Sequence, residues 1–333
     1  MNRRKKIIFS LLLIFLFSIS FLVFYKIFIR KDKITMVTKT ENKEEDTLES
    51  IDKKEPFTVT DQITAPEKKE EEKKEEEKKQ SEEPKKEEKS ELNNTDIKAM
   101  DTREKDWYFK FKGEGNLPEP PKEAKSYISN GLAYFTGGGN EKVLYLTFDE
   151  GYENGYTSKI LEVLKRMNVK ATFFVTKPYI SSNKTLVQNI VKEGHLVANH
   201  SDTHPSMASV ALTGYEKFSL ELINVEKEFK NVTGKEIAKF FRPPMGKYSE
   251  LSLYYAKKLG YKNIFWSFAY GDYDVNKQPE KVYAKNHILK NTHNGAILLL
   301  HAISKTNTEI LEELITEWRK RGYEFKTLDY IKD

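Results

Sequence analysis

Four short polar motifs in this 333-residue chain contain the residue types that could carry out hydrolysis. They supply two adjacent carboxylates, two histidines four positions apart, an arginine and a further histidine, and together these groups could form a metal-dependent hydrolase site. Three of the four motifs directly follow an apolar run, which is where a buried strand would end. In chain order, the motifs are residues 147–151 (TFDEG), 199–205 (NHSDTHP), 242–246 (RPPMG) and 298–301 (LLLH).

The first motif places Asp149 and Glu150 directly before Gly151. Adjacent side chains on a strand point to opposite faces of the sheet. Since glycine favours a turn, we expect the strand to end there, so that both carboxylates turn toward the mouth of a pocket. A capping or solvent-facing pair of carboxylates is the alternative interpretation.

The second motif contains His200 and His204, which are four positions apart. On a helix or in a tight loop, two imidazoles at this spacing can face the same ion, and divalent transition metals are often bound in this way. We therefore expect both histidines to be metal ligands. The alternative is a pair of surface histidines beside the turn at Pro205.

The third motif has Arg242 directly before Pro243 and Pro244, two residues that restrict the backbone and have no N–H to donate. A buried arginine that faces Asp149 would keep that carboxylate ionised and oriented. We therefore expect Arg242 to face Asp149 and to keep its carboxylate charged and in place.

The fourth motif ends the apolar run 296–300 at His301. A single histidine after such a run is often a hydrogen-bonded core residue. Because the other three motifs are present, we expect His301 instead to act as a general acid, since imidazole titrates near neutral pH.

The elements that must position these groups alternate between strands and helices along the C-terminal part of the chain. Repeated β–α units indicate a parallel sheet, in which the carboxyl ends of the strands meet at one face. About seven such units predict closure into a distorted (β/α) barrel, and an open doubly wound sheet is the alternative. The expected strands are 143–148, 171–176, 195–199, 240–242, 263–267, 296–300 and 324–327, and the expected helices are 160–167, 186–192, 214–231, 249–259, 280–291 and 308–321.

The N-terminal third of the chain has a different composition. Four basic residues precede an apolar run at 7–25, which is long enough to span a bilayer, so we expect a signal anchor within residues 1–30. A cleaved signal peptide is the alternative. Residues 31–100 are dominated by Lys and Glu and predict a disordered linker, followed by a catalytic domain at 101–333 on the extracytoplasmic side.

Charge and cysteine content exclude some classes of site. The net charge of +5 is spread over the linker and the N-terminus, so we infer no nucleic-acid partner. The chain has no cysteine, which excludes disulfides, thiolate metal sites and cysteine nucleophiles.

The order and spacing of the four motifs resemble those of the polysaccharide deacetylase family with NodB homology, carbohydrate esterase family 4, over residues 142–330. Three further stretches resemble the delta-lactam-biosynthetic de-N-acetylases, which act on muramic acid residues of spore cortex peptidoglycan. These stretches are residues 107–109 (WYF), 145–157 (YLTFDEGYENGYT) and 265–267 (FWS). The resemblance implies a distorted (β/α) barrel and removal of acetyl groups from N-acetylated sugars.

The resemblance also implies a role for each matching residue. The implied roles are Asp149 as base, Arg242 as the residue that holds the base, His301 as acid and Asp272 as its support; Glu150, His200 and His204 as ligands of a divalent metal ion, with zinc expected; the Met245 N–H as oxyanion donor; and Leu299 and Tyr273 as walls of the acetyl pocket.

Two positions depart from the family pattern. Glu150 stands where the family usually has a metal-binding Asp, and its extra methylene would change the coordination geometry. Tyr273 stands where the family usually has Trp. Residues other than Asp also occur at the position of Glu150 in muramic-type members. Glu150 therefore favours that subfamily, while it weakens the prediction of tight zinc binding.

The function that follows is metal-assisted hydrolytic de-N-acetylation of N-acetylmuramic acid in peptidoglycan, on the way to the muramic delta-lactam of spore cortex. The partners are then glycan strands and, through the N-terminal helix, the membrane. A general peptidoglycan N-acetylglucosamine or chitin-type deacetylase is the alternative enzyme. A non-catalytic wall-binding module with a decayed metal site at Glu150 is the alternative outside enzymes.

Overall fold

The computed structural model describes residues 97 and 99–331. The predicted signal anchor and nearly all of the predicted linker lie outside these residues. Within the described part of the chain, no helix is both long enough and apolar enough to cross a membrane.

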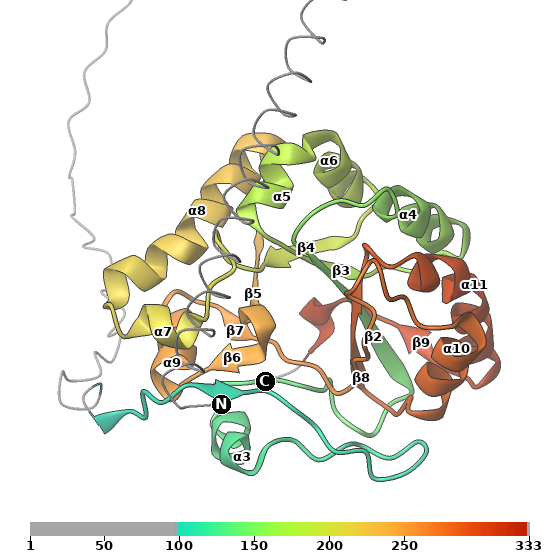
Figure 1. The fold of residues 1–333 in the computed structure, drawn as a ribbon, viewed down its shortest axis with the longest axis horizontal. Coiled ribbons are helices and arrows are strands. Elements are labelled where there is room, and N and C mark those ends of the chain that lie inside the picture. Colours follow the sequence, from blue (N-terminus) through green and yellow to red (C-terminus); the bar gives the residue numbers. More distant parts are fainter. Residues whose placement is uncertain (1–96, 98, 332–333) are drawn as a thin grey trace, which may run out of the picture. The chain divides into compact units, whose positions relative to one another are not determined.

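A parallel sheet forms the centre of the described domain (Figure 1). Its strands pair in the order β7-β5-β4-β3-β2-β8, and β9 also pairs with β2. The strands are β2 (Val143–Glu150), β3 (Thr172–Val175), β4 (Leu196–Asn199), β5 (Ala238–Phe241), β7 (Lys262–Asn263), β8 (Ala296–His301) and β9 (Glu324–Phe325). All eight residues of β2 are buried, as expected for a strand covered on both faces, where the sequence reads as a nearly continuous apolar run.

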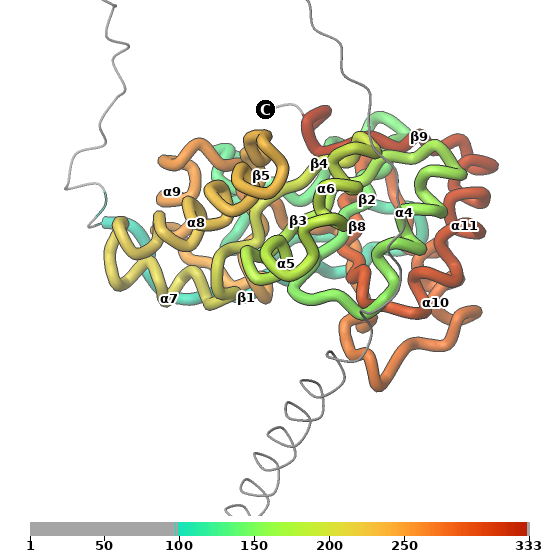
Figure 2. Tube along the Cα trace, turned by 90° about the horizontal axis from the view of Figure 1, so that it is seen from above, coloured from blue at the N-terminus to red at the C-terminus, as the bar shows by residue number. Residues whose placement is uncertain are grey.

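Helices cover the outside of the sheet, and Figure 2 shows them in a row along its length. Helix α4 is typical, because its apolar residues Ile160, Leu161 and Leu164 recur on one face and are buried in the main core. The helices are α4 (Thr157–Arg166), α5 (Lys177–Ser182), α6 (Lys184–Lys192), α7 (Met207–Ala211), α8 (Tyr215–Thr233), α9 (Glu250–Lys258), α10 (Lys281–Lys290) and α11 (Lys305–Lys320), with 3-10 turns η2 (Pro244–Gly246) and η3 (Leu328–Tyr330).

The sheet curls so that the segment after β7 reaches β8. The N–H groups of Ser267 and Phe268 lie 3.1 and 3.3 Å from the carbonyl of Ile297. The Leu299 N–H in turn donates to the Phe268 carbonyl at 2.9 Å. The predicted strand 263–267 is therefore wrong in its extent, because β7 ends at Asn263 and only isolated parallel bridges, of Ile264 with Tyr134 and of Phe268 with Leu298, continue the pairing. The sheet is a curled half-barrel, which confirms the predicted (β/α) architecture over the open doubly wound alternative.

An N-terminal segment packs beside the sheet and includes elements that the sequence patterns did not predict. Strand β1 (Lys105–Asp106) pairs antiparallel with β6 (Lys247–Tyr248), and the turn η1 (Lys122–Ala124) leads into α3 (Lys125–Ser129). Trp107 belongs to a separate hydrophobic cluster here, stacked on Phe265 with ring centroids 4.2 Å apart. Helices α5 and α7 were also missed, since six and five residues are too few for apolar periodicity to be recognised.

Candidate active site

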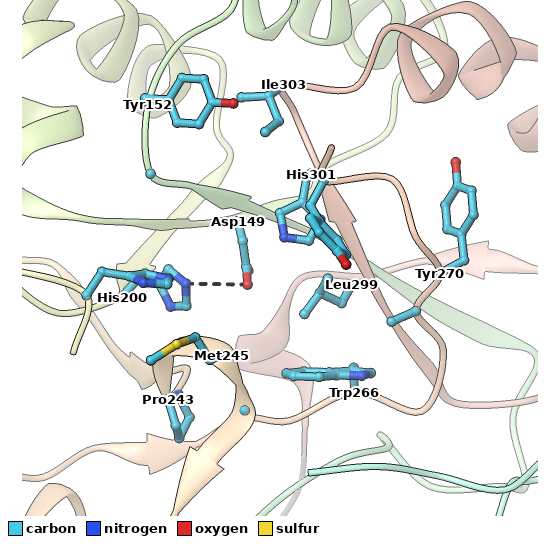
Figure 3. A pocket seen from close by; sticks show the side chains of 15 residues that line it. Asp149, Tyr152, His200, Pro243, Met245, Trp266, Tyr270, Leu299, His301 and Ile303 are labelled. Carbon is cyan, nitrogen blue, oxygen red and sulfur yellow. Dashed lines mark ion pairs between the residues drawn. The ribbon is translucent and has the colours of Figure 1, made fainter. Parts of the chain in front are cut away.

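The four motifs lie at the carboxyl ends of neighbouring strands and meet at one pocket of about 760 Å³ (Figure 3). In Figure 3 the Asp149 side chain lies between His200 on one side and His301 on the other, with Met245 and Trp266 across the pocket. The lining residues are Asp149, Gly151, Tyr152, His200, His204, Pro243, Met245, Gly246, Trp266, Ala269, Tyr270, Tyr273, Leu299, His301 and Ile303.

Asp149 forms a buried ion pair with Arg242. The Arg242 Nη1 lies 2.6 Å from Asp149 Oδ1, and the guanidinium has no solvent exposure and sits 4.1 Å above the ring of Phe174. Burial alone would raise the pKa of Asp149, but the positive charge of Arg242, with a further contribution from His200, holds the pKa below its ordinary value. The expected contact between Arg242 and the carboxylate is therefore present in the structure.

His200 lies on the other side of the Asp149 carboxylate. Its Nδ1 is 2.8 Å from the Arg242 carbonyl, so Nδ1 carries the proton and Nε2 is left with a lone pair, 3.6 Å from Asp149 Oδ2. The ring of His204 is 4.9 Å away between centroids. Burial lowers the pKa of His200 to about 4 and also lowers the pKa of His204. Both imidazoles are neutral at neutral pH and face the pocket.

The loop that carries the two histidines has an unusual backbone. Ser201 and His204 have φ angles of 73° and 58°, a left-handed conformation that is uncommon for residues other than glycine. Two hydrogen bonds hold it: Asn199 Oδ1 accepts from the Ser201 N–H, and Ser201 Oγ accepts from the His204 N–H, both at 2.9 Å. His200 and His204 are thus brought together by a tight loop rather than by a helix.

Glu150 does not join the histidines, which corrects the prediction that it is a metal ligand. Strand β2 continues through Glu150, so this side chain points to the face opposite Asp149 and is absent from the pocket lining. It is fully buried, its Oε1 lies 3.3 Å from Thr157 Oγ1, and its Oε2 has no hydrogen-bond partner. Burial, with the nearby charge of Glu153, raises its pKa well above the ordinary value.

The histidine pair fits a divalent metal ion, but only as two ligands. No group of three or more His, Asp or Glu side chains within residues 97 and 99–331 is placed to hold an ion. His200 and His204 nevertheless offer neutral nitrogens to the pocket, and the hydrogen bond from His200 Nδ1 to a carbonyl is the support that metal-binding histidines commonly have. Any ion here would be held by these two residues without Glu150.

His301 and Asp272 form the second charged pair of the site. The Asp272 carboxylate accepts from His301 Nδ1 at 2.7 Å and from the His301 backbone N–H at 2.8 Å. Burial would lower the pKa of His301, but the charges of Asp272 and Asp149 raise it above its ordinary value. Since Nδ1 is held by Asp272, Nε2 is the nitrogen available to the pocket. The expected support of His301 by Asp272 is thus formed.

The predicted oxyanion donor Met245 and the two predicted walls of the acetyl pocket, Leu299 and Tyr273, all line the pocket. Met245 has a left-handed φ of 58° within the turn that follows β5, and its side chain is 54% exposed at the pocket wall. Leu299 is buried two residues before His301, and the ring of Tyr273 lies 6.0 Å from the His301 ring.

Sequence reasoning missed some residues of the site. Asn307 donates from Nδ2 to Asp272 Oδ2 at 2.5 Å, although it lies in α11, outside the four motifs. Tyr152, Tyr270 and Ile303 line the pocket as well. The signal for Tyr152 was available, because it directly follows the first motif; nothing in the local pattern marks Asn307.

Comparison with known proteins identifies the family of this chain. The family model described as Polysaccharide deacetylase matches residues 136–264. Peptidoglycan-N-acetylmuramic acid deacetylase PdaA of Bacillus subtilis is 41% identical over 67% of this chain and 84% of that protein. The chain belongs to the polysaccharide deacetylase family. Its members are hydrolases of carbon–nitrogen bonds other than peptide bonds.

The solved structure of the same relative and one further relative of this polysaccharide deacetylase extend the comparison. The solved structure of Bacillus subtilis PdaA, a family 4 carbohydrate esterase, is 40% identical with a TM-score of 0.66, covering 69% of this chain and 97% of that one. A peptidoglycan-N-acetylglucosamine deacetylase of Bacillus cereus is 31% identical over 58% of this chain and 89% of that protein.

Proposed function

We propose that this chain hydrolyses the acetamide of N-acetylmuramic residues in peptidoglycan, giving acetate and a free sugar amine. The single observation that carries the chemistry is the placement, across one pocket, of Asp149 bonded to Arg242 and of His301 bonded to Asp272. The arginine lowers the pKa of Asp149 and Asp272 raises the pKa of His301, which favours a charged carboxylate and a protonated imidazole. These are the protonation states that a base and an acid need before the reaction starts.

Asp149 acts as the general base. Arg242 occupies Oδ1, which leaves Oδ2 toward the pocket to take a proton from a water molecule as that water attacks the acetamide carbonyl carbon. The ion pair keeps the carboxylate charged despite its burial. The Met245 N–H, presented by the turn after β5, stabilises the oxyanion that develops on the carbonyl oxygen.

His301 acts as the general acid. Asp272 accepts a hydrogen bond from Nδ1, so Nε2 carries the proton that is given to the sugar nitrogen as the carbon–nitrogen bond breaks. The acetyl carbon leaves as acetate, with the oxygen of the water. Asp149 then holds one proton and His301 lacks one, and exchange with solvent restores both.

His200 and His204 would hold a divalent metal ion, with zinc the expected one. When bound, such an ion polarises a carbonyl oxygen and acidifies water. The neutral state of both imidazoles, caused by burial, supports this role.

The muramic substrate is favoured by the relatives. PdaA, whose name specifies N-acetylmuramic acid, is 41% identical, and the deacetylase named for N-acetylglucosamine is 31% identical. The N-acetylglucosamine activity is the second candidate. The formed pairs Asp149–Arg242 and His301–Asp272 argue against a non-catalytic wall-binding module. In a muramic product the free amine lies beside the lactyl carboxyl, which would permit closure of the delta-lactam of spore cortex.

The test is a comparison of glycan strands. Purified protein is incubated with intact and with peptide-stripped strands, and the strands are digested to disaccharides. The sugar in which hydrogen has replaced an acetyl group is then identified by mass spectrometry. Loss from muramic acid supports the proposal. Loss only from glucosamine selects the second candidate, and no loss from either sugar refutes both.

We also propose a location for this activity from the sequence. Residues 1–30 would anchor the chain in the membrane, residues 31–100 would form the linker, and residues 101–333 would act on the extracytoplasmic side, where peptidoglycan lies. Protease added outside intact protoplasts should then remove the catalytic domain; its full protection would refute this location.

A further inference from the structure

The segment 101–107, here named the N-terminal strap, is bonded to the turn that carries Met245. Residues Lys105 and Asp106 of the strap pair antiparallel with Tyr248 and Lys247. Directly after this pair, the Trp107 N–H donates to the Gly246 carbonyl at 2.8 Å. Three consecutive strap residues therefore hold the chain from Gly246 onward, immediately after the proposed oxyanion donor.

The side chain of Trp107 also fixes this turn by contact. It is 6% exposed and stacks on Phe265 with 17° between the ring planes, and its Nε1 donates to the Trp266 carbonyl at 2.9 Å. A Cβ added to Gly246 would lie 3.1 Å from the Trp107 Cβ and 2.8 Å from the Trp266 ring. Gly246 is thus enclosed by two tryptophans, and its φ of 67° lies in the left-handed region that favours glycine.

The turn has two backbone hydrogen bonds of its own, from the Gly246 N–H to the Pro243 carbonyl at 3.1 Å and from the Lys247 N–H to the Pro244 carbonyl, and neither involves the Met245 N–H. Met245 has a left-handed φ of 58°, a strained conformation that persists only when the surroundings hold it. Pro243 and Pro244 precede it and have no N–H groups with which to bond the turn to its neighbours.

The strap also joins this turn to the histidine loop. The Glu104 carboxylate contacts Lys247 Nζ and the hydroxyl of Ser206, and it accepts from Ser209 Oγ at 3.2 Å. Ser206 caps α7, the helix that follows His204. Glu104 is solvent-accessible, so we attribute only a small part of the effect to its charge.

We propose that the N-terminal strap is a positioning element of the active site, and that Trp107 is a positioning residue that acts through Gly246 on the Met245 N–H. This inference rests on the proposed function, because it assigns the strap to the oxyanion donor of that reaction. In the sequence, Trp107 was singled out only as part of the stretch 107–109, which resembles the delta-lactam-biosynthetic de-N-acetylases. In this proposal the strap, at the start of the domain, helps to fix the geometry of the active site.

The experiment uses the full-length chain and three variants: Trp107→Ala, Trp107→Phe and Leu253→Ala. Leu253 is buried in the same cluster as Trp107 but is absent from the pocket lining, so its variant controls for loss of core packing. The measurements are kcat and KM for acetate release, and hydrogen exchange of the backbone amides of Met245, Gly246, Lys247 and Tyr248.

Trp107→Ala should lower kcat by roughly 10- to 100-fold, somewhat less than the ~10²- to 10³-fold loss on removing an oxyanion donor outright, while KM changes little. It should also accelerate exchange at 245–248. Trp107→Phe keeps the stack on Phe265 and should recover most of kcat. Leu253→Ala should lower the unfolding midpoint without changing kcat.

Unchanged kcat and unchanged exchange in Trp107→Ala would overturn the inference, as would equal losses of kcat in Leu253→Ala. If Trp107→Ala does not fold, Trp107→Phe should still show smaller changes in the same direction, and their absence would overturn it. A wild-type protein that releases no acetate would refute the proposed function alone, because the exchange measurement tests the strap without any substrate.

Discussion

Glu150→Gln gives a sharp test of the geometry, because the sequence and the structure place this side chain differently. In the structure the carboxyl is buried behind β2, its pKa is raised well above the ordinary value, and it faces Thr157 rather than the histidines. Gln is nearly isosteric with a neutral glutamic acid. We therefore expect kcat/KM and bound metal to stay within about threefold of wild type, since neither a ligand nor a charge is lost.

The same variant should change how stability depends on pH. A carboxyl whose folded pKa is raised keeps its proton in the folded state while the unfolded chain loses it, so stability falls as pH rises from the unfolded pKa near 4.3 to the folded pKa. The slope for one proton is about 1.4 kcal/mol per pH unit. Gln removes this slope, so Glu150→Gln should gain stability relative to wild type as pH rises through that window.

Urea unfolding at a series of pH values measures this difference, with Glu114→Gln, at an exposed position, as the control for removal of one negative charge. Equal pH dependence in wild type and Glu150→Gln would show that the carboxyl is not held neutral. A loss of activity of about 100-fold or more together with loss of metal would refute the structural placement, because only a direct ligand is expected to have both effects.

Other changes test the acid, the histidine pair and the domain boundary. Asp272→Asn removes the charge that raises the pKa of His301, so the alkaline limb of the kcat/KM profile should move to lower pH. An unmoved limb would show that Asp272 does not raise the pKa of the general acid. His200→Ala or His204→Ala should remove bound metal, measured by elemental analysis, and lower the rate by orders of magnitude; intact activity in both variants and with a chelator would exclude a catalytic ion at the pair. Deletion of residues 1–100 should leave a soluble, cooperatively unfolding and active domain, because the strap remains; an insoluble product would move the boundary.

The parallel sheet and most of its helices could be predicted because the apolar periodicity is strong. The run at β2 is buried throughout, and α4, α8 and α11 follow their predicted spans closely. The β7 segment was predicted too long because the buried residues after Asn263 form only isolated bridges, of Ile264 with Tyr134 and of Phe268 with Leu298, and not a continuous strand.

Some residues of the site could likewise be predicted from the sequence, and others could not. Residues at strand ends, such as Asp149 and His301, could be placed because parallel strands end at one face. The direction of the Glu150 side chain depended on whether β2 ended before or after this residue, because successive residues of a strand point to opposite faces. The left-handed φ of Met245 and the support from Asn307 arise from tertiary contacts, which local sequence does not encode.

The most direct test of the central claim is acetate release by Asp149→Asn on peptidoglycan strands. Asn keeps the size of the side chain but cannot take a proton from water, so turnover should fall by at least ~10²-fold, the lower range for loss of a general base. Binding of the strands, measured separately, should persist because only the transition state needs the base. Turnover near that of wild type, with binding intact, would contradict the assignment of Asp149 as the base.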